Sequence, residues 1–181
     1  MNFINQSTYY GGAILKYYFR KINSEDTNNV WSLIELLKKE GADISFTELK
    51  SKDEVMNFID NPAQLTYVAV TKEDPSSILS VVRGRRDMSN EKSHAAFLTA
   101  ATAPHARGSG LAAELTNFAL EQMKKEGVNI ARIYVYSNNH ASLNAVKKLG
   151  FVHDGTVLRH HRDQVTGAYV DDLIFHKVLE D

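Results

Sequence analysis

Residues 104–112 (Pro-His-Ala-Arg-Gly-Ser-Gly-Leu-Ala) combine residue types suited to binding a phosphate. They join a β-branched, strand-like run to an amphipathic helical pattern with Leu111 on its apolar side. Glycines let successive backbone N–H groups point outward, and a helix N-terminus carries partial positive charge. Arg107 stands beside the glycines, and its guanidinium matches phosphate oxygens. The segment therefore predicts a phosphate-binding loop at the start of a helix.

Other interpretations of the glycines are weaker. Residues 108–113 match the dinucleotide fingerprint G-x-G-x-x-G/A, but the next expected strand ends in Tyr-Ser-Asn at 136–138 and not in an acidic residue. The remaining chain, about seventy residues, is also too short for a second nucleotide-binding half. No Gly-Lys-Ser/Thr follows, which excludes a Walker loop. A tight strand-to-helix turn without a ligand stays open as the structural alternative.

The surrounding chain predicts a mixed order of helices and strands. Ser24 and Ser51 are candidate N-caps for two helices, and Glu54 completes a capping box with Ser51. Further helices are expected after Gly110, with Glu114 on the outer face, and over residues 141–149. Apolar alternation and turn signals predict strands over 13–22, 65–70, 78–82, 94–103, 130–136, 151–162 and 169–178.

Bulk properties limit the possible classes of function. The 181 residues suffice for one well-buried core, so we expect an N-terminal extension (1–12) and one domain (13–181). A net charge of −1 argues against a nucleic-acid partner, and no apolar run approaches the length of a membrane span. The absence of cysteine excludes disulfides, thiolate-bound metal and a cysteine nucleophile. No metal is expected, and without a secretion signal a cytoplasmic location is expected.

Two motifs together resemble the GCN5-related N-acetyltransferase (GNAT) family. Residues 107–112 resemble its R/Q-x-x-G-x-G/A motif, and residues 139–151 resemble its second motif, an Asn and a small residue before a helix ending in Lys-x-Gly-Phe. Residues 169–173 resemble the closing strand of many bacterial members, and the resemblance extends over roughly 14–179. It implies a single α/β (α+β) domain with a mixed, mostly antiparallel sheet of about seven strands, splayed at its centre, and about four helices.

The resemblance also implies acetyl-CoA as the donor. Arg107 and the backbone amides of Gly108, Ser109, Gly110, Leu111 and Ala112 would hold the pyrophosphate. The strand edge at Ala100, Ala101 and Thr102 would pair with the pantetheine amides like an added strand. Asn139, with Ser142 in the same motif, would contact the pantetheine arm. The acceptor would be a primary amine of a small molecule or a protein, attacking directly in a ternary complex. A homodimer is compatible with the family.

The family's usual acid–base residues are replaced. Its frequent glutamate on the third strand falls at Phe97, its carboxylate on the next strand at Tyr134, and its proton-donating tyrosine at Val146. A weakened enzyme, or an acyl-CoA-binding module with little or no transfer activity, is therefore an alternative. A protein with an accidental glycine turn and no CoA affinity is a third possibility.

Three other side chains are candidates for the acid–base work. Tyr134 and Tyr136 lie on one face of their strand, so both hydroxyls face the cleft or neither does. His160 and His161 are strand neighbours, so at most one faces the site, and imidazole suits a general base. We select Tyr134, Tyr136 and His161, against the structural alternatives of sheet packing and a surface histidine.

The acceptor is less well defined by the sequence. In this fold it is shaped by residues 24–60 and the last hairpin. Glu48, Asp53 and Glu54 suggest an amine, although a solvated face explains them equally well. The basic run at 83–86 is typical of a solvated strand end, or else it meets the 3′-phosphate of CoA or an acidic substrate.

Overall fold

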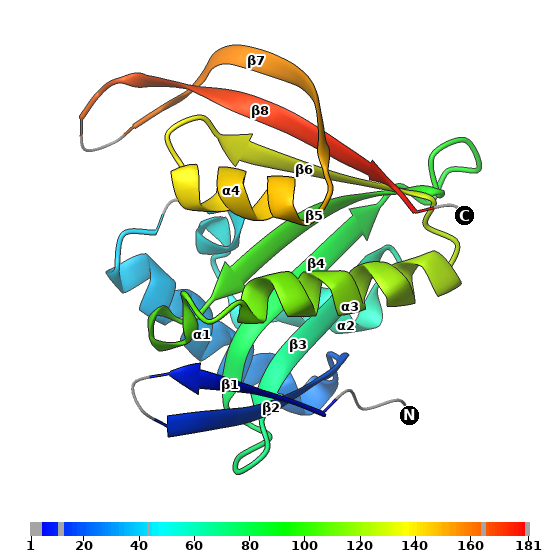
Figure 1. Ribbon diagram of the computed structural model, residues 1–181. Coiled ribbons are helices and arrows are strands. Elements are labelled where there is room, and N and C mark those ends of the chain that lie inside the picture. The colour runs from blue at the N-terminus through cyan, green and yellow to red at the C-terminus, as the bar shows by residue number, and fades with distance from the viewer. Residues whose placement is uncertain (1–4, 11–12, 43, 164–165, 180–181) are drawn as a thin grey trace.

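The computed structural model describes residues 5–10, 13–42, 44–163 and 166–179. Across these residues the strands form one eight-stranded sheet in the order β1-β2-β3-β4-β5-β6-β8-β7 (Figure 1). Neighbouring strands are antiparallel except for β5 and β6, which are parallel. The strands are β1 (Asn5–Tyr10), β2 (Ala13–Lys21), β3 (Gln64–Thr71), β4 (Ile78–Arg86), β5 (Ala95–Thr102), β6 (Ile130–Tyr136), β7 (Val152–Arg162) and β8 (Tyr169–Val178).

Helices cover both faces of this sheet. Helices α3 and α4 lie in front of it in Figure 1, and α1 and α2 lie behind. The α-helices are α1 (Thr27–Lys39), α2 (Lys52–Asp60), α3 (Leu111–Lys125) and α4 (His140–Lys148). Short 3₁₀ turns are η1 (Ser24–Asp26), η2 (Ser45–Glu48) and η3 (Pro104–Ala106). The predicted fold class, a mostly antiparallel mixed sheet with four α-helices among the described residues, is confirmed.

The N-terminal segment differs from the expectation. Residues 5–10, placed in an extension by the sequence, form β1 and pair with β2 in antiparallel register. The sheet therefore has eight strands among the described residues, one more than expected. Strand pairing uses main-chain groups that every residue carries, so a polar segment with no apolar alternation can still add to a free sheet edge.

Both predicted helix caps lie close to their expected places. The Ser51 hydroxyl accepts the Glu54 N–H at 3.4 Å, so Ser51 is the N-cap of α2 as predicted. The reciprocal half of the predicted capping box differs, because the Glu54 carboxylate accepts the N–H of Lys50 and not that of Ser51. The cap before the first helix lies one residue earlier than expected, because Asn23 and Asp26 form a capping box around η1 and Ser24 already lies in this turn. Helix α1 follows η1 directly, with Asp26 as its N-cap and no side-chain cap of its own.

Helix α3 is held to the sheet by a buried apolar stripe and two tyrosine hydroxyls. The Tyr17 hydroxyl donates to Glu114 at 2.8 Å, and that of Tyr67 donates to Glu126 at 2.9 Å. Burial and these acidic partners raise the pKa of both phenols. Glu114, predicted to face outward, therefore links the first turn of α3 to β2. The fully buried stripe residues are Leu111, Leu115, Ala119 and Met123.

The close approach of α3 to β4 depends on the missing side chain of Gly84. A Cβ there would meet the Cε and Sδ of buried Met123 at 2.5 and 2.7 Å. We predict that Gly84→Val destabilises the protein by about 1–3 kcal/mol through overpacking. Gly155→Val is the control, because a Cβ at Gly155 on β7 meets nothing within 4 Å. Urea unfolding measures both variants, and equal losses of stability would contradict this account of the contact.

Candidate active site

The centre of the sheet opens between β5 and β6. Their parallel pairing runs only from Ala95↔Ile130 to Leu98↔Ile133. Beyond that point β5 continues beside β4 to Thr102, and β6 continues beside β8 to Tyr136. The two strands consequently diverge and leave a gap between their inner edges (Figure 1).

Two main-chain hydrogen bonds fix which groups of β5 face this gap. The carbonyl of His94, just before β5, accepts the Ile130 N–H at 3.1 Å, on the β6 side. The N–H of Ala103, just after β5, donates to Leu79 on the β4 side at 2.8 Å. Main-chain groups of successive strand residues point to opposite neighbours. Even-numbered residues of β5 therefore present their N–H and C=O groups toward β6.

Two of the three predicted strand-edge residues meet this condition. Ala100 and Thr102 lie beyond the last β5–β6 pair, so their main-chain groups point into the gap. Ala101 does not, because its carbonyl accepts the Ser80 hydroxyl at 2.9 Å on the β4 side. The expectation for the main chain of Ala101 is therefore wrong, and an added strand would pair with Ala100 and Thr102.

The glycine loop presents open amides directly after β5 and η3. Gly108 and Gly110 have φ values of 76° and 86°, a conformation that residues with a Cβ rarely adopt. Gly110 is the N-cap of α3 and supplies no side-chain cap. Among the described residues, the N–H groups of Gly108, Gly110 and Ala112 have no hydrogen-bond partner. These three amides form a site for an anion at a helix N-terminus.

Leu111, also predicted to offer its amide, does not share this arrangement. The Ser109 hydroxyl accepts the Leu111 N–H at 3.4 Å and donates to the carbonyl of Ala106 at 2.8 Å. The Leu111 side chain is buried in the core. Ser109 thus closes the base of the loop and occupies the Leu111 amide in this state, so the role of that amide toward a phosphate stays a prediction.

Arg107 is already engaged in this state of the protein. Its two terminal nitrogens donate to the carboxylate of Glu40 at 2.8 and 2.7 Å, and its Nε donates to the Thr102 carbonyl at 3.2 Å. Glu40 is the C-cap of α1, which lies on the opposite face of the sheet from α3. A phosphate near Arg107 must therefore compete with Glu40. No sequence pattern indicates Glu40, because 67 positions separate it from Arg107.

The second motif forms a helix cap. The Asn139 side-chain oxygen accepts the Ser142 N–H at 3.0 Å, which makes Asn139 the N-cap of α4. The structure thus brings Asn139 and Ser142 together at the end of β6. Since that oxygen is used, the Asn139 amide nitrogen is the part of the side chain left to contact a ligand.

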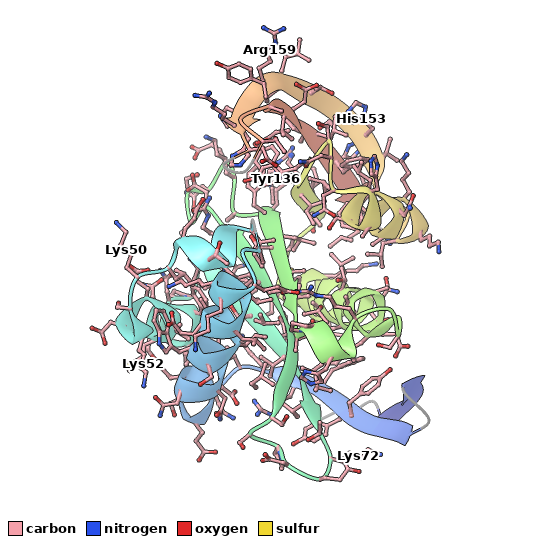
Figure 2. All side chains as sticks on the ribbon, turned by 90° about the vertical axis from the view of Figure 1, so that its left-hand side faces the viewer. Lys50, Lys52, Lys72, Tyr136, His153 and Arg159 are labelled. Carbon is pink, nitrogen blue, oxygen red and sulfur yellow. The ribbon has the colours of Figure 1, made fainter. Side chains whose placement is uncertain are left out.

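Aromatic stacks occupy the face of β5 and β6 next to the opening. The rings of Phe97 and Tyr134 stack with centroids 5.2 Å apart, and those of Tyr136 and His161 stack at 4.5 Å. Tyr134 and Tyr136 share a face, as alternation predicts, and about half of Tyr134 is exposed. Tyr136 lies beneath the curved β7–β8 hairpin in Figure 2. Three of the predicted chemical side chains therefore lie along one edge of the gap.

The two neighbouring histidines contact two adjacent residues, Tyr136 and Asp172, because β7 is irregular. Its register with β8 shifts between Val157 and His161, and Arg159 has a φ of 52°. His161 turns to Tyr136, and His160 Nδ1 lies 2.9 Å from Asp172 Oδ2. His161 therefore contacts Tyr136, and the choice of His161 as the histidine that faces the site stays a prediction.

The acidic pair on β8 supports this bulge. Asp171 Oδ1 accepts the Arg159 N–H at 2.7 Å, and Asp172 lies opposite Tyr136 in the β6–β8 register. Asp172 is buried, and its Oδ1 has no hydrogen-bond partner among the described residues. Both carboxylates therefore hold β7 in place.

The family's usual proton-transfer positions hold no titratable carboxylate here. Phe97 is in the aromatic stack, and Val146 is buried on α4. Among the described residues no group of three or more His, Asp or Glu side chains is arranged to hold a metal ion. In the same part of the chain, no helix has the length and apolar character of a membrane span.

Comparisons with known proteins agree with this geometry. The model of the acetyltransferase (GNAT) family matches residues 30–151. A GNAT-family acetyltransferase from Streptococcus pneumoniae superimposes with a TM-score of 0.79 at 19% identity, over 90% of this chain and 99% of its own. A GCN5-related N-acetyltransferase from Kribbella flavida gives a TM-score of 0.77 at 19% identity, over 90% and 97%.

A third solved structure belongs to a protein named for its substrate. The ribosomal-protein-S5-alanine acetyltransferase from Vibrio fischeri gives a TM-score of 0.74 at 17% identity, over 91% of this chain and 94% of its own. At such identities the likeness shows the fold alone. No curated protein matches the chain in sequence. The family model spans about two thirds of the chain and includes the glycine loop, the opening and α4, so the chain belongs to the GNAT acetyltransferase family.

Proposed function

We propose that this protein is an acetyl-CoA-dependent N-acetyltransferase that acts on a primary amine. The observation that carries the proposal is a continuous line of unpaired main-chain groups. It begins at the amides of Gly108, Gly110 and Ala112 and continues along β5 with the Thr102 N–H and the main-chain groups of Ala100. The Thr102 carbonyl, which now accepts the Arg107 Nε, joins this line when Arg107 moves. A ligand with a diphosphate at one end and amides along its arm matches this line in both chemistry and order.

The chain's residues fit such a donor at each point. The loop amides would hold the pyrophosphate, with Arg107 beside it after it leaves Glu40. The edge of β5 would pair with the pantetheine arm, and the Asn139 amide nitrogen would contact it from the β6 side. When bound, acetyl-CoA supplies the thioester carbonyl that the amine attacks.

Groups around the opening would then stabilise the oxyanion, accept a proton from the amine and donate a proton to the departing sulfur. The unpaired Ala100 N–H is placed to donate to the oxyanion that develops on the carbonyl. His161, stacked on Tyr136, would take the proton from the amine, directly or through water. Tyr134, half exposed beside Phe97, would give a proton to the departing sulfur. With no cysteine in the chain, attack in a ternary complex replaces an acyl-cysteine intermediate.

A second candidate function is an acyl-CoA-binding module with little transfer. It is favoured by Phe97 and Val146, which replace proton-transfer residues of the family. The two functions differ in one measurable property, since a binding module retains CoA affinity without releasing thiol. The amine acceptor, a cytoplasmic location and a homodimer remain predictions.

The loop is tested by titrating acetyl-CoA calorimetrically. We predict that Arg107→Gln and Gly110→Trp each weaken binding by about tenfold or more, since they remove a phosphate contact or cover the loop amides. Gly127→Trp is the control, because Gly127 has the same φ of 86° near the other end of α3. Wild-type protein that does not bind acetyl-CoA would reject both candidate functions.

Breaking the Arg107–Glu40 ion pair should strengthen acetyl-CoA binding, whereas the loop variants weaken it. Glu40→Gln should tighten acetyl-CoA binding by about three- to tenfold, since it frees the guanidinium and removes a charge that repels phosphate. Glu35→Gln is the control, because it removes the same charge from α1 while breaking only an exposed pair with Lys38. Equal affinities for the two variants in calorimetry would show that Glu40 does not compete with the donor.

The acid–base assignment is tested by thiol release with a panel of amines. We predict that His161→Gln lowers kcat by about tenfold or more with little change in acetyl-CoA affinity, because a general base contributes about that much or more. Tyr136→Phe should have a smaller effect. His153→Gln on the same strand is the control, since its ring packs on Phe175 and contacts Thr156. An unchanged pH profile for His161→Gln would exclude this role.

A further inference from the structure

Arg83 is a cation held among aromatic rings without a carboxylate partner. Its guanidinium carbon lies 4.5 Å from the ring centre of Phe58 on α2 and 5.1 Å from that of Phe46 on η2. Both rings are buried. Among the described residues Arg83 forms no ion pair and no hydrogen bond, and its Nε is buried without a partner. Burial, more than the charge of nearby Arg85, lowers its pKa to about 10, so it stays protonated at neutral pH.

The free end of this guanidinium reaches a groove. Only Nε of Arg83 is both buried and unpartnered, so the two terminal nitrogens are accessible. They open into a groove of about 400 Å3 lined by residues of α2, β3 and β4. That volume suits a small molecule. Gln64 lines the same groove, and its Oε1 is likewise buried without a partner. The groups that a ligand in this groove can reach are the terminal nitrogens of Arg83 and the amide nitrogen of Gln64, all of them hydrogen-bond donors.

The groove's acidic residues do not neutralise Arg83. Glu54 accepts the Lys50 N–H at 2.9 Å and so belongs to the cap of α2. Asp53 is exposed in the same helical turn, and Glu48 acts on Arg83 only at longer range. Lys50 and Lys52 project outward from this region in Figure 2. A guanidinium with accessible donors, aromatic faces and no counter-ion is suited to a carboxylate.

The sheet register places Arg83 beside the opening. Arg83 lies directly opposite Thr99 on β5, and Thr99 is the first residue beyond the β5–β6 pairing. Thr99 also shares a face with Phe97, whose ring stacks on Tyr134. Side chains of directly opposed strand residues are about 5 Å apart at Cβ. A group bound by Arg83 is therefore within a few bonds of the point where an amine would attack.

We propose that the acceptor is a small amino acid or related amine that carries a carboxylate, and that Arg83 binds this carboxylate. The inference rests on the proposed function, because it names the substrate class of the same site. Arg83 supplies a planar pair of donors, and Gln64 supplies a further polar contact along the groove. The rings of Phe46 and Phe58 hold the guanidinium in place and exclude water from one of its faces.

The test uses matched probes that differ only by the carboxylate. Glycine, β-alanine, 4-aminobutyrate and 5-aminopentanoate are compared with methylamine, ethylamine, propylamine and butylamine. Dissociation constants are measured by ligand-observed NMR titration, with free protein and with protein saturated with CoA. We expect at least one amino acid of the series to bind about tenfold more tightly than its matched amine. The chain length of the amino acid that binds most tightly should then indicate the distance from Arg83 to the opening.

Two variants separate binding from folding. Arg83→Met should remove the preference for the carboxylate while thermal stability is kept or raised, because a buried charge without a partner is lost. Arg86→Met, on the opposite face of β4 and outside the residues that line the groove, should keep the preference. A retained preference in Arg83→Met, equal binding of both series, or binding of neither series would overturn the inference. Since these titrations need no transfer, a failure of acetyl-CoA to bind would count against the proposed function instead.

Discussion

The separation of β5 from β6 is the constraint on which the rest of the site depends. Each strand has a complete partner on its outer side, β4 for β5 and β8 for β6, so neither needs the other beyond Leu98 and Ile133. Unpaired main-chain groups in the middle of a sheet cost free energy unless water or a ligand satisfies them. Such an opening is therefore stable only because β5 pairs fully with β4 and β6 pairs fully with β8. It favours a ligand whose amides can hydrogen-bond to the strand edge as another strand would.

Two arginines near the opening illustrate different electrostatic situations. Arg107 is partly exposed and pairs with Glu40, a contact that contributes little net stability and exchanges readily for a phosphate. Arg83 is desolvated and has aromatic neighbours but no carboxylate partner. Desolvating a charge without a partner costs more than an exposed pair can return. The arrangement of Arg107 suits a site where a phosphate replaces a protein carboxylate. The arrangement of Arg83 suits a site where the ligand itself supplies the carboxylate.

Local patterns predicted the elements and most of the donor loop. Three predictions follow from residues a few positions apart: the N-cap at Ser51, the glycine turn at Gly108 and Gly110, and the shared face of Tyr134 and Tyr136. The features that the sequence did not predict depend on how distant segments are placed relative to one another. Glu40 meets Arg107 only because α1 ends across from the loop, and Ala101 turns away from the gap because of its pairing with β4. No pattern within one segment encodes such relations.

The bulge in β7 connects these observations to catalysis. In a regular strand neighbouring side chains alternate between faces, and a slip of one residue would exchange them. Here the shift before His161, with Arg159 at positive φ, sets His161 on Tyr136 while His160 contacts Asp172. Bulges commonly re-aim side chains near active sites. With Phe97 and Val146 in place of the family's acid–base residues, the proposed proton transfer depends on this irregularity of β7, since a regular strand would not bring this pair of histidines to the same two contacts.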